Sequence, residues 1–152
     1  MHSLLEEFLD TERKKICLLD DNFLGHPKWE EMLQGLKAVK KPFQFRQGLD
    51  ERLLDDRKCA ALFASRYDDT YTFAFDNIAD AEVIESKMAL ARKYTNARLR
   101  FYCFCGFDRE DVWDESFWAE DVFGLFKRIE ILMRHQCLPY VMRFNRYVES
   151  PF

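Results

Sequence analysis

The sequence predicts an α/β fold with about five parallel strands and covering helices. Five short apolar runs alternate with segments of helical period, which is the pattern of strand–helix units. Most of these units have a similar length, close to that of one strand, one helix and their loops. The composition, with 48% hydrophobic and 33% charged residues in a chain of 152, can bury the core of a single domain.

The five apolar runs are rich in aromatic and β-branched residues, and most end in polar residues or glycine, as buried parallel strands do. They begin at residues 16, 42, 70, 97 and 138, so that successive units span 26, 28, 27 and 41 residues. The predicted strands are residues 16–20, 42–47, 70–76, 97–107 and 138–144.

Four segments between these strands place their apolar residues on one helical face. The first covers residues 29–39, the second covers 53–62, and the third follows Asp80, a candidate N-cap. The fourth and longest has an apolar stripe over residues 122–133, and residues 1–13 predict one more helix before the first strand.

A closed eight-fold barrel usually needs about 250 residues. Five units therefore make either an arc of a barrel or a small open sheet, which we expect to form one domain over residues 1–152. A helix that begins the chain without a preceding strand suggests a partial domain, truncated at its N-terminus. Such an arc has two open edges, at residues 16–20 and 138–144.

The charge and cysteine patterns exclude several classes of protein. A net charge of −4 without a basic block argues against a dedicated nucleic-acid binder. No run of 18 uncharged apolar residues is present, so we expect no membrane span. Five cysteines without a disulfide spacing favour a reducing, cytoplasmic setting.

Polar residues follow each predicted strand, where ligands bind in parallel α/β folds. Acidic and amide side chains there suit a ligand with amine and hydroxyl groups, or a divalent metal. The same residue types also form turns and helix caps, and this alternative stays open. The residues concerned are Asp20, Asp21, Asn22, Gln47, Asp50, Asp76, Asn77, Gly106 and Phe107.

The sequence also suggests two kinds of metal site, one formed by aspartates and one by cysteines. A metal-dependent α/β hydrolase or lyase would use Asp20, Asp21 and Asp76. The thiols of Cys103 and Cys105, two residues apart in a predicted strand, face the same side. However, zinc-binding cysteines usually lie in turns, so we expect these two to be buried as small hydrophobic residues.

The segment ICLLDDNFLGHP, at residues 16–27, resembles the second strand and following loop of radical S-adenosylmethionine (radical SAM) enzymes. The resemblance is to the subset in which that strand ends in Asp-Asp-Asn-Phe. It continues in chain order through FQFRQGLD at 43–50, FAFDNI at 73–78, FYCFCGF at 101–107 and LPYVMR at 138–143.

The resemblance implies a partial (β/α) TIM-like barrel that binds S-adenosylmethionine on a [4Fe–4S] cluster. Reductive cleavage of this cofactor gives a radical that abstracts hydrogen from a substrate, whose identity the sequence does not give. The resemblance assigns the methionine amino group to Asp20, Asp21 and Asn22, and the ribose to Asp76 and Asn77. It places the adenine near Cys105, Gly106, Phe107 and Met142. Gln47 and Asp50 complete the expected cofactor-binding set.

The family holds its cluster with a Cys-x3-Cys-x2-Cys motif after its first strand, and this chain does not contain that motif. We therefore expect the chain alone to be inactive. A missing N-terminal segment, or another chain, would have to supply the cluster ligands, unless the protein is a degenerate relative. The alternative is a non-catalytic half-barrel that associates through its open sheet edges.

Overall fold

The computed structural model describes residues 12–19, 22–107 and 114–144, which form an α/β fold. The strands are β1 (Ile16–Leu18), β2 (Phe43–Phe45), β3 (Thr72–Ala74), β4 (Arg100–Cys105) and β5 (Leu138–Arg143). The α-helices are α1 (Trp29–Ala38), α2 (Asp56–Phe63), α3 (Ala81–Ala91) and α4 (Glu115–Arg134). Three short 3-10 turns are η2 (Phe23–Gly25), η3 (Glu51–Leu53) and η4 (Ile78–Asp80).

The strands are parallel and follow chain order, in two small sheets. One sheet is β1-β2 and the other is β3-β4-β5. Two isolated parallel bridges connect the segments that carry β2 and β3. Phe43 of β2 pairs with Tyr67 in the loop before β3, and Leu49 after β2 pairs with Phe73 of β3. The predicted α/β fold with parallel strands is confirmed. The expected single arc is divided between β2 and β3, and the described strands do not close into a barrel.

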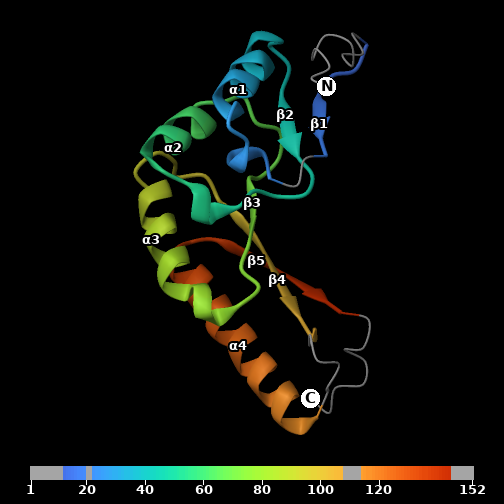
Figure 1. Cartoon of the computed structure of the whole chain (residues 1–152), viewed down its shortest axis with the longest axis vertical. Coiled ribbons are helices and arrows are strands. Elements are labelled where there is room, and N and C mark those ends of the chain that lie inside the picture. The colour runs from blue at the N-terminus through green and yellow to red at the C-terminus, as the bar shows by residue number, and fades with distance from the viewer. Residues whose placement is uncertain (1–11, 20–21, 108–113, 145–152) are drawn as a thin grey trace.

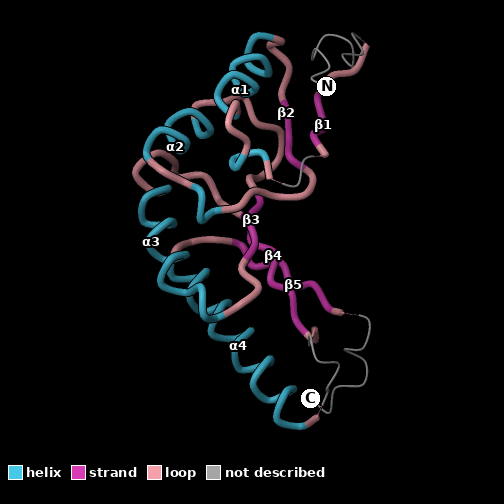
Figure 2. Tube along the Cα trace, in the orientation of Figure 1, coloured by secondary structure: helices cyan, strands magenta, loops and turns pink. Residues whose placement is uncertain are grey.

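The helices and the strands form two layers. Helices α1 to α4 lie along one side of the molecule, and the strands lie on the other (Figure 1). The same arrangement is clear when helices and strands are coloured separately (Figure 2). The hydrophobic core lies between the layers, with α4 packed on β4 and β5.

Strand β4 shows how the layers determine exposure. Its residues alternate, with Phe101, Cys103 and Cys105 buried toward the helices. Arg100, Tyr102 and Phe104 are only half-buried, since they point to the other side. We call this second side, together with Gln44 and Arg46 of the neighbouring segment, the open face. A helix layer on one side only produces this period of two.

One sequence expectation for the helices is wrong, and a second is confirmed in position only. Phe126 and Met133, placed in the apolar stripe of α4, are 66% and 61% exposed, whereas Arg128 on the same helix is buried. Asp80 occupies the N-cap position of α3, but its side chain makes no capping hydrogen bond. Of the predicted first helix, residues 1–11 lie outside the described part of the chain.

The two expected sheet edges are present in the described residues. There β1 pairs only with β2, and β5 pairs only with β4. Leu19 beside β1 is 76% exposed, and Val141 and Met142 in β5 are 42% and 41% exposed. In residues 12–19, 22–107 and 114–144 no helix has the length and hydrophobicity needed to cross a membrane.

Candidate functional site

The carboxyl ends of the strands bring most of the predicted site residues to one edge of the sheets, which we call the rim. Asp50 follows β2, Asp76 and Asn77 follow β3, and Gly106 and Phe107 follow β4. Met142 lies near the end of β5, opposite Phe104 of β4. Asn22 follows β1, whereas Asp20 and Asp21 lie outside the described residues. The metal-dependent alternative, which needs both of these aspartates, therefore stays a prediction.

Three of the predicted residues cap the turns that follow the strands. The Oδ1 atoms of Asn22 and Asn77 accept hydrogen bonds from the backbone N–H groups of Gly25 and Ala79. Asp50 accepts from the backbone N–H of Arg52 and pairs with its guanidinium at 2.9 Å. The hydrogen bond from the Arg52 side chain lowers the pKa of Asp50. The turn-forming role expected as the alternative is therefore confirmed for these three side chains.

Asp76 has a different position, because it continues the pairing of β3 with β4. The N–H of Phe75 donates to the carbonyl of Tyr102 at 2.8 Å. One step further on, the N–H of Phe104 donates to Oδ1 of Asp76 at 2.9 Å. A side-chain carboxylate thus takes the place of a main-chain carbonyl in the ladder. The side chain is otherwise exposed at the rim.

A buried arginine on α4, Arg128, binds the ends of β3 and β4 from the helix side of the sheet. Nη1 of Arg128 donates to the carbonyls of Phe75 and Phe104, at 2.8 and 2.9 Å, and Nε donates to that of Gly124. Arg128 is 2% exposed, so its charge is stabilised by main-chain oxygens rather than by water. The arginine therefore sets the relative position of the two strands that carry Asp76 and Gly106.

The end of β4 combines a left-handed turn with an apolar surface. Gly106 has φ +78°, in the left-handed region that glycine tolerates best, and its N–H donates to Oδ2 of Asp121 at 2.8 Å. Phe107, 49% exposed, contacts the rings of Phe104 and Phe144. With Met142, this part of the rim offers exposed apolar atoms beside polar ones.

Glu51 is a buried carboxyl group next to the rim. It is 4% exposed, so its carboxyl group is largely removed from water. Burial raises the pKa of Glu51 to about 7, and the neighbouring charge of Asp50 adds to this effect. Glu51 can therefore change its protonation state near neutral pH, as groups in functional sites often do.

Sequence reasoning missed Glu51, Asp121 and Arg128. Arg128 lies three residues after Leu125 and four before Leu132, both buried, so its position on the helix indicates burial. Asp121 lies four residues before Leu125 on the same face. The helical period therefore indicates burial for Arg128 and partial burial for Asp121, whereas Glu51 lies in a turn and has no such period around it.

The cysteines do not assemble into a metal site. Cys59, Cys103, Cys105 and Cys137 are buried and Cys17 is exposed, all as free thiols. In the described ranges, no three His, Cys, Asp or Glu side chains lie together as ligands would. Burial raises the pKa of Cys59 and Cys103 to about 11, which disfavours the thiolate that binds metals. These thiols do not fit a [4Fe–4S] cluster.

A pocket on the open face contains none of the predicted site residues. It lies at the amino ends of β3 and β4 and beside the carboxyl end of β2, where Arg46 precedes the predicted residue Gln47. Its lining comes instead from the segments around β2, β3 and β4. Comparisons of the chain with protein-family models, curated proteins and solved structures found no match.

Proposed function

We propose that this chain is the core of a radical SAM-type enzyme, a partial (β/α) barrel whose rim binds S-adenosylmethionine. The observation that carries the proposal is the junction of β3 with β4. There an exposed carboxylate, Asp76, lies next to the turn of Gly106 and Phe107. The parallel strands in chain order agree with the architecture that the resemblance implies.

The free oxygen of Asp76 suits the ribose of the cofactor. Oδ1 is engaged by the N–H of Phe104, but in the described residues Oδ2 receives no hydrogen bond. A carboxylate oxygen at an exposed rim can accept from a ribose hydroxyl, and such charge-assisted hydrogen bonds are stronger than neutral ones. Arg128 keeps this oxygen in place indirectly, because it fixes the two strand ends.

The apolar side of the rim suits the adenine ring. Phe107 and Met142 are both about half exposed at the ends of neighbouring strands, and Phe144 packs against Phe107. Flat aromatic ligands stack favourably on such side chains. In this proposal the ribose and the adenine therefore lie side by side across the ends of β3, β4 and β5.

The proposal for this chain is limited to cofactor binding. In the family, the cluster supplies the electron that cleaves the bound cofactor. The cysteines of this chain do not fit the cluster, so we assign no chemical step to its residues. A further segment or a second chain with the Cys-x3-Cys-x2-Cys motif would have to complete the site.

Calorimetric titration of the chain with S-adenosylmethionine tests the proposal. Asp76→Asn keeps an acceptor for the N–H of Phe104 but removes the charge, and we expect it to weaken binding about tenfold. Glu82→Gln, at an exposed position in the first turn of α3, is the matched control and should bind like the wild type. Equal affinity in both variants, or no binding to the wild type, contradicts the proposal.

The exposure of β5 favours a second candidate function, a non-catalytic half-barrel that associates through its open edge. Five of the six β5 residues are exposed, including apolar ones on both faces of the strand. An edge strand of this kind can pair with another chain. A stable dimer that does not respond to S-adenosylmethionine would support this candidate over the first.

A further inference from the structure

The chain segments that carry β2 and β3 are joined by two isolated bridges and separate between them. They meet at Phe43 with Tyr67 and again at Leu49 with Phe73, and five residues on each segment lie between these points. The hydroxyl of Tyr67 accepts a hydrogen bond from the N–H of Phe45 at 2.9 Å. The Tyr67 side chain, from the loop before β3, thus takes the hydrogen bond that a neighbouring strand would accept from Phe45. Between Phe45 and Leu49 the two segments are not paired.

Gly48 lets the two segments meet again. It has φ +87°, and a Cβ added there would lie 3.3 Å from the carbonyl oxygen of Thr72. Any other residue would therefore be strained and would push the strands apart. The opening is bounded by Tyr67 at one end and Gly48 at the other.

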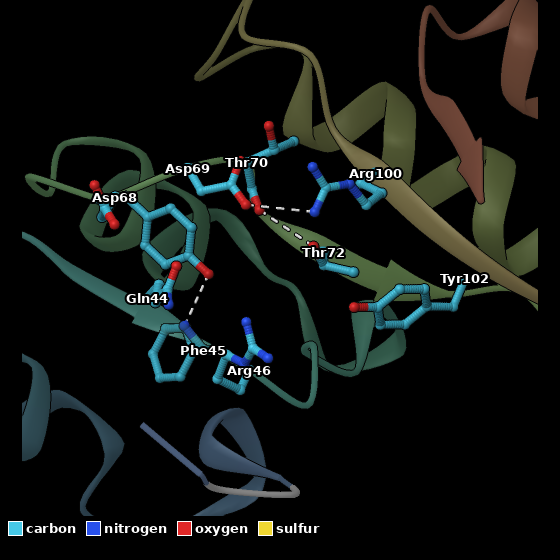
Figure 3. Close-up of a pocket in the computed structure, with 10 residues that line it drawn as sticks. Gln44, Phe45, Arg46, Asp68, Asp69, Thr70, Thr72, Arg100 and Tyr102 are labelled. Carbon is cyan, nitrogen blue, oxygen red and sulfur yellow. Dashed lines mark hydrogen bonds and ion pairs between the residues drawn. The ribbon is translucent and has the colours of Figure 1, made fainter. Parts of the chain in front are cut away.

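A pocket of about 140 Å³ lies in this opening on the open face. Figure 3 shows the guanidinium groups of Arg46 and Arg100 and the hydroxyl of Tyr102 directed toward it. The lining residues are Gln44, Phe45, Arg46, Tyr67, Asp68, Asp69, Thr70, Thr72, Arg100 and Tyr102.

The charges of the pocket do not balance. Asp68 is paired with Lys15 at 2.9 Å, and Asp69 contacts one guanidinium nitrogen of Arg100 at 3.4 Å. The guanidinium of Arg46 has neither a hydrogen-bond nor an ion-pair partner among the described residues. Two lining arginines and Lys15 thus face two carboxylates, which leaves one positive charge in excess.

The backbone conformation of Asp69 places its carboxylate against the guanidinium of Arg100. Its φ of +68° lies in the left-handed region, which a non-glycine residue adopts at some cost in free energy. In this conformation its carboxylate reaches Arg100 from the loop before β3. Asp69 thereby orients a guanidinium group that still has unused N–H donors.

We propose that this pocket binds a small anionic group, a carboxylate or a phosphate, between Arg46 and Arg100. Guanidinium groups bind the paired oxygens of such anions through two parallel hydrogen bonds. Tyr102 and Gln44 can donate further hydrogen bonds to the same anion. The pocket is smaller than the roughly 300–1,000 Å³ of sites for drug-sized ligands, so it suits one acidic group of a ligand.

This inference goes beyond the proposed function and does not depend on it. The pocket lies at the amino ends of β3 and β4 and beside the carboxyl end of β2, whereas the groups proposed to bind ribose and adenine lie at the carboxyl ends of β3, β4 and β5. Binding of a simple anion can therefore be measured without S-adenosylmethionine.

NMR titrations of the full chain with succinate and with inorganic phosphate, at constant ionic strength, test the inference. We compare the wild type with Arg46→Gln, Arg100→Gln and a control, Arg98→Gln. Arg98 is an exposed arginine outside the pocket, so its loss removes the same charge elsewhere. The exposed position of Arg46 makes its replacement tolerable for folding.

We expect at least one anion to shift the amide signals of Arg46, Thr72 and Arg100. Arg46→Gln should weaken its affinity by about tenfold or more, and Arg98→Gln by less than twofold. Preference for succinate or for phosphate identifies the acidic group. No binding of either anion, or an equal loss in Arg98→Gln, overturns the inference.

Discussion

Asp76 and Arg128 bind opposite main-chain groups of the same residue. The carboxylate of Asp76 accepts from the N–H of Phe104, and the guanidinium of Arg128 donates to its carbonyl oxygen. Arg128 also binds the carbonyl of Phe75, the residue before Asp76. The ends of β3 and β4 are thus held together by side chains at the point where both strands reach the rim.

Replacing Arg128 should destabilise the fold strongly. Arg128→Met leaves the carbonyls of Phe75 and Phe104 without these donors in a buried place, so we expect a loss of about 3 kcal/mol in the free energy of unfolding. Lys127→Met, on the exposed side of the same helix, should cost less than about 0.5 kcal/mol. Urea unfolding measures both, and similar losses would show that Arg128 does not clamp the strands.

Glu51 should make the stability depend on pH. Its pKa is about 7 in the folded state against 4.5 for an ordinary glutamate, so between these values the folded chain keeps a proton that the unfolded chain releases. Stability should therefore fall as pH rises from 4.5 to 7. The fall attributable to Glu51 is up to about 3 kcal/mol, at about 1.4 kcal/mol per pKa unit.

Glu51→Gln has no proton to lose, so its stability should lack this decline. Glu120→Gln, exposed on α4, should keep the wild-type dependence. Chemical unfolding at several pH values between 4.5 and 7 distinguishes the two. A variant Glu51→Gln with the wild-type slope would mean that Glu51 is not protonated in the fold.

The chain should not hold a [4Fe–4S] cluster by itself. Four of its thiols are buried, and burial raises the pKa of each of them, which disfavours the thiolate that binds iron. After anaerobic treatment with iron and sulfide, followed by desalting, we expect no stoichiometric iron or cluster absorbance. A stable cluster that is lost in Cys103→Ala would instead make the strand thiols its ligands.

The edge at β5 should cause self-association. Val141 is exposed on the edge strand, so Val141→Lys places a charge where another chain would pair. Sedimentation should show association of the wild type and an increase of at least about tenfold in the dissociation constant of Val141→Lys. Ala38→Lys, exposed at the end of α1, is the control. A wild type that stays monomeric at high concentration would contradict this prediction.

The order of strands and helices was predictable because it depends on local periodicity. The five strands and the four helices lie within or close to the predicted segments. Tertiary hydrogen bonds were not predictable in this way. Arg128 reaches the carbonyl of Phe75 across 53 residues, and the separation of β2 from β3 depends on Tyr67, a loop residue.

The roles of the rim residues were harder to predict, because one residue type serves two purposes. Asp and Asn after a strand suit both a ligand and a turn, and Asn22, Asp50 and Asn77 do form caps. Only the structure separates Asp76 from them, since its carboxylate continues the ladder between two strands. The pocket of Arg46 and Arg100 gave no signal because its residues come from distant segments.

Binding of S-adenosylmethionine at the rim is tested most directly by mapping the cofactor on the chain. Nitrogen–proton NMR spectra recorded during a titration with S-adenosylmethionine report each backbone amide separately. We predict saturable shifts at Asp50, Asp76, Asn77, Gly106 and Phe107, and none at exposed positions of α1 such as Glu31. An absence of shifts, or shifts confined to the Arg46 and Arg100 pocket, would contradict binding at the rim.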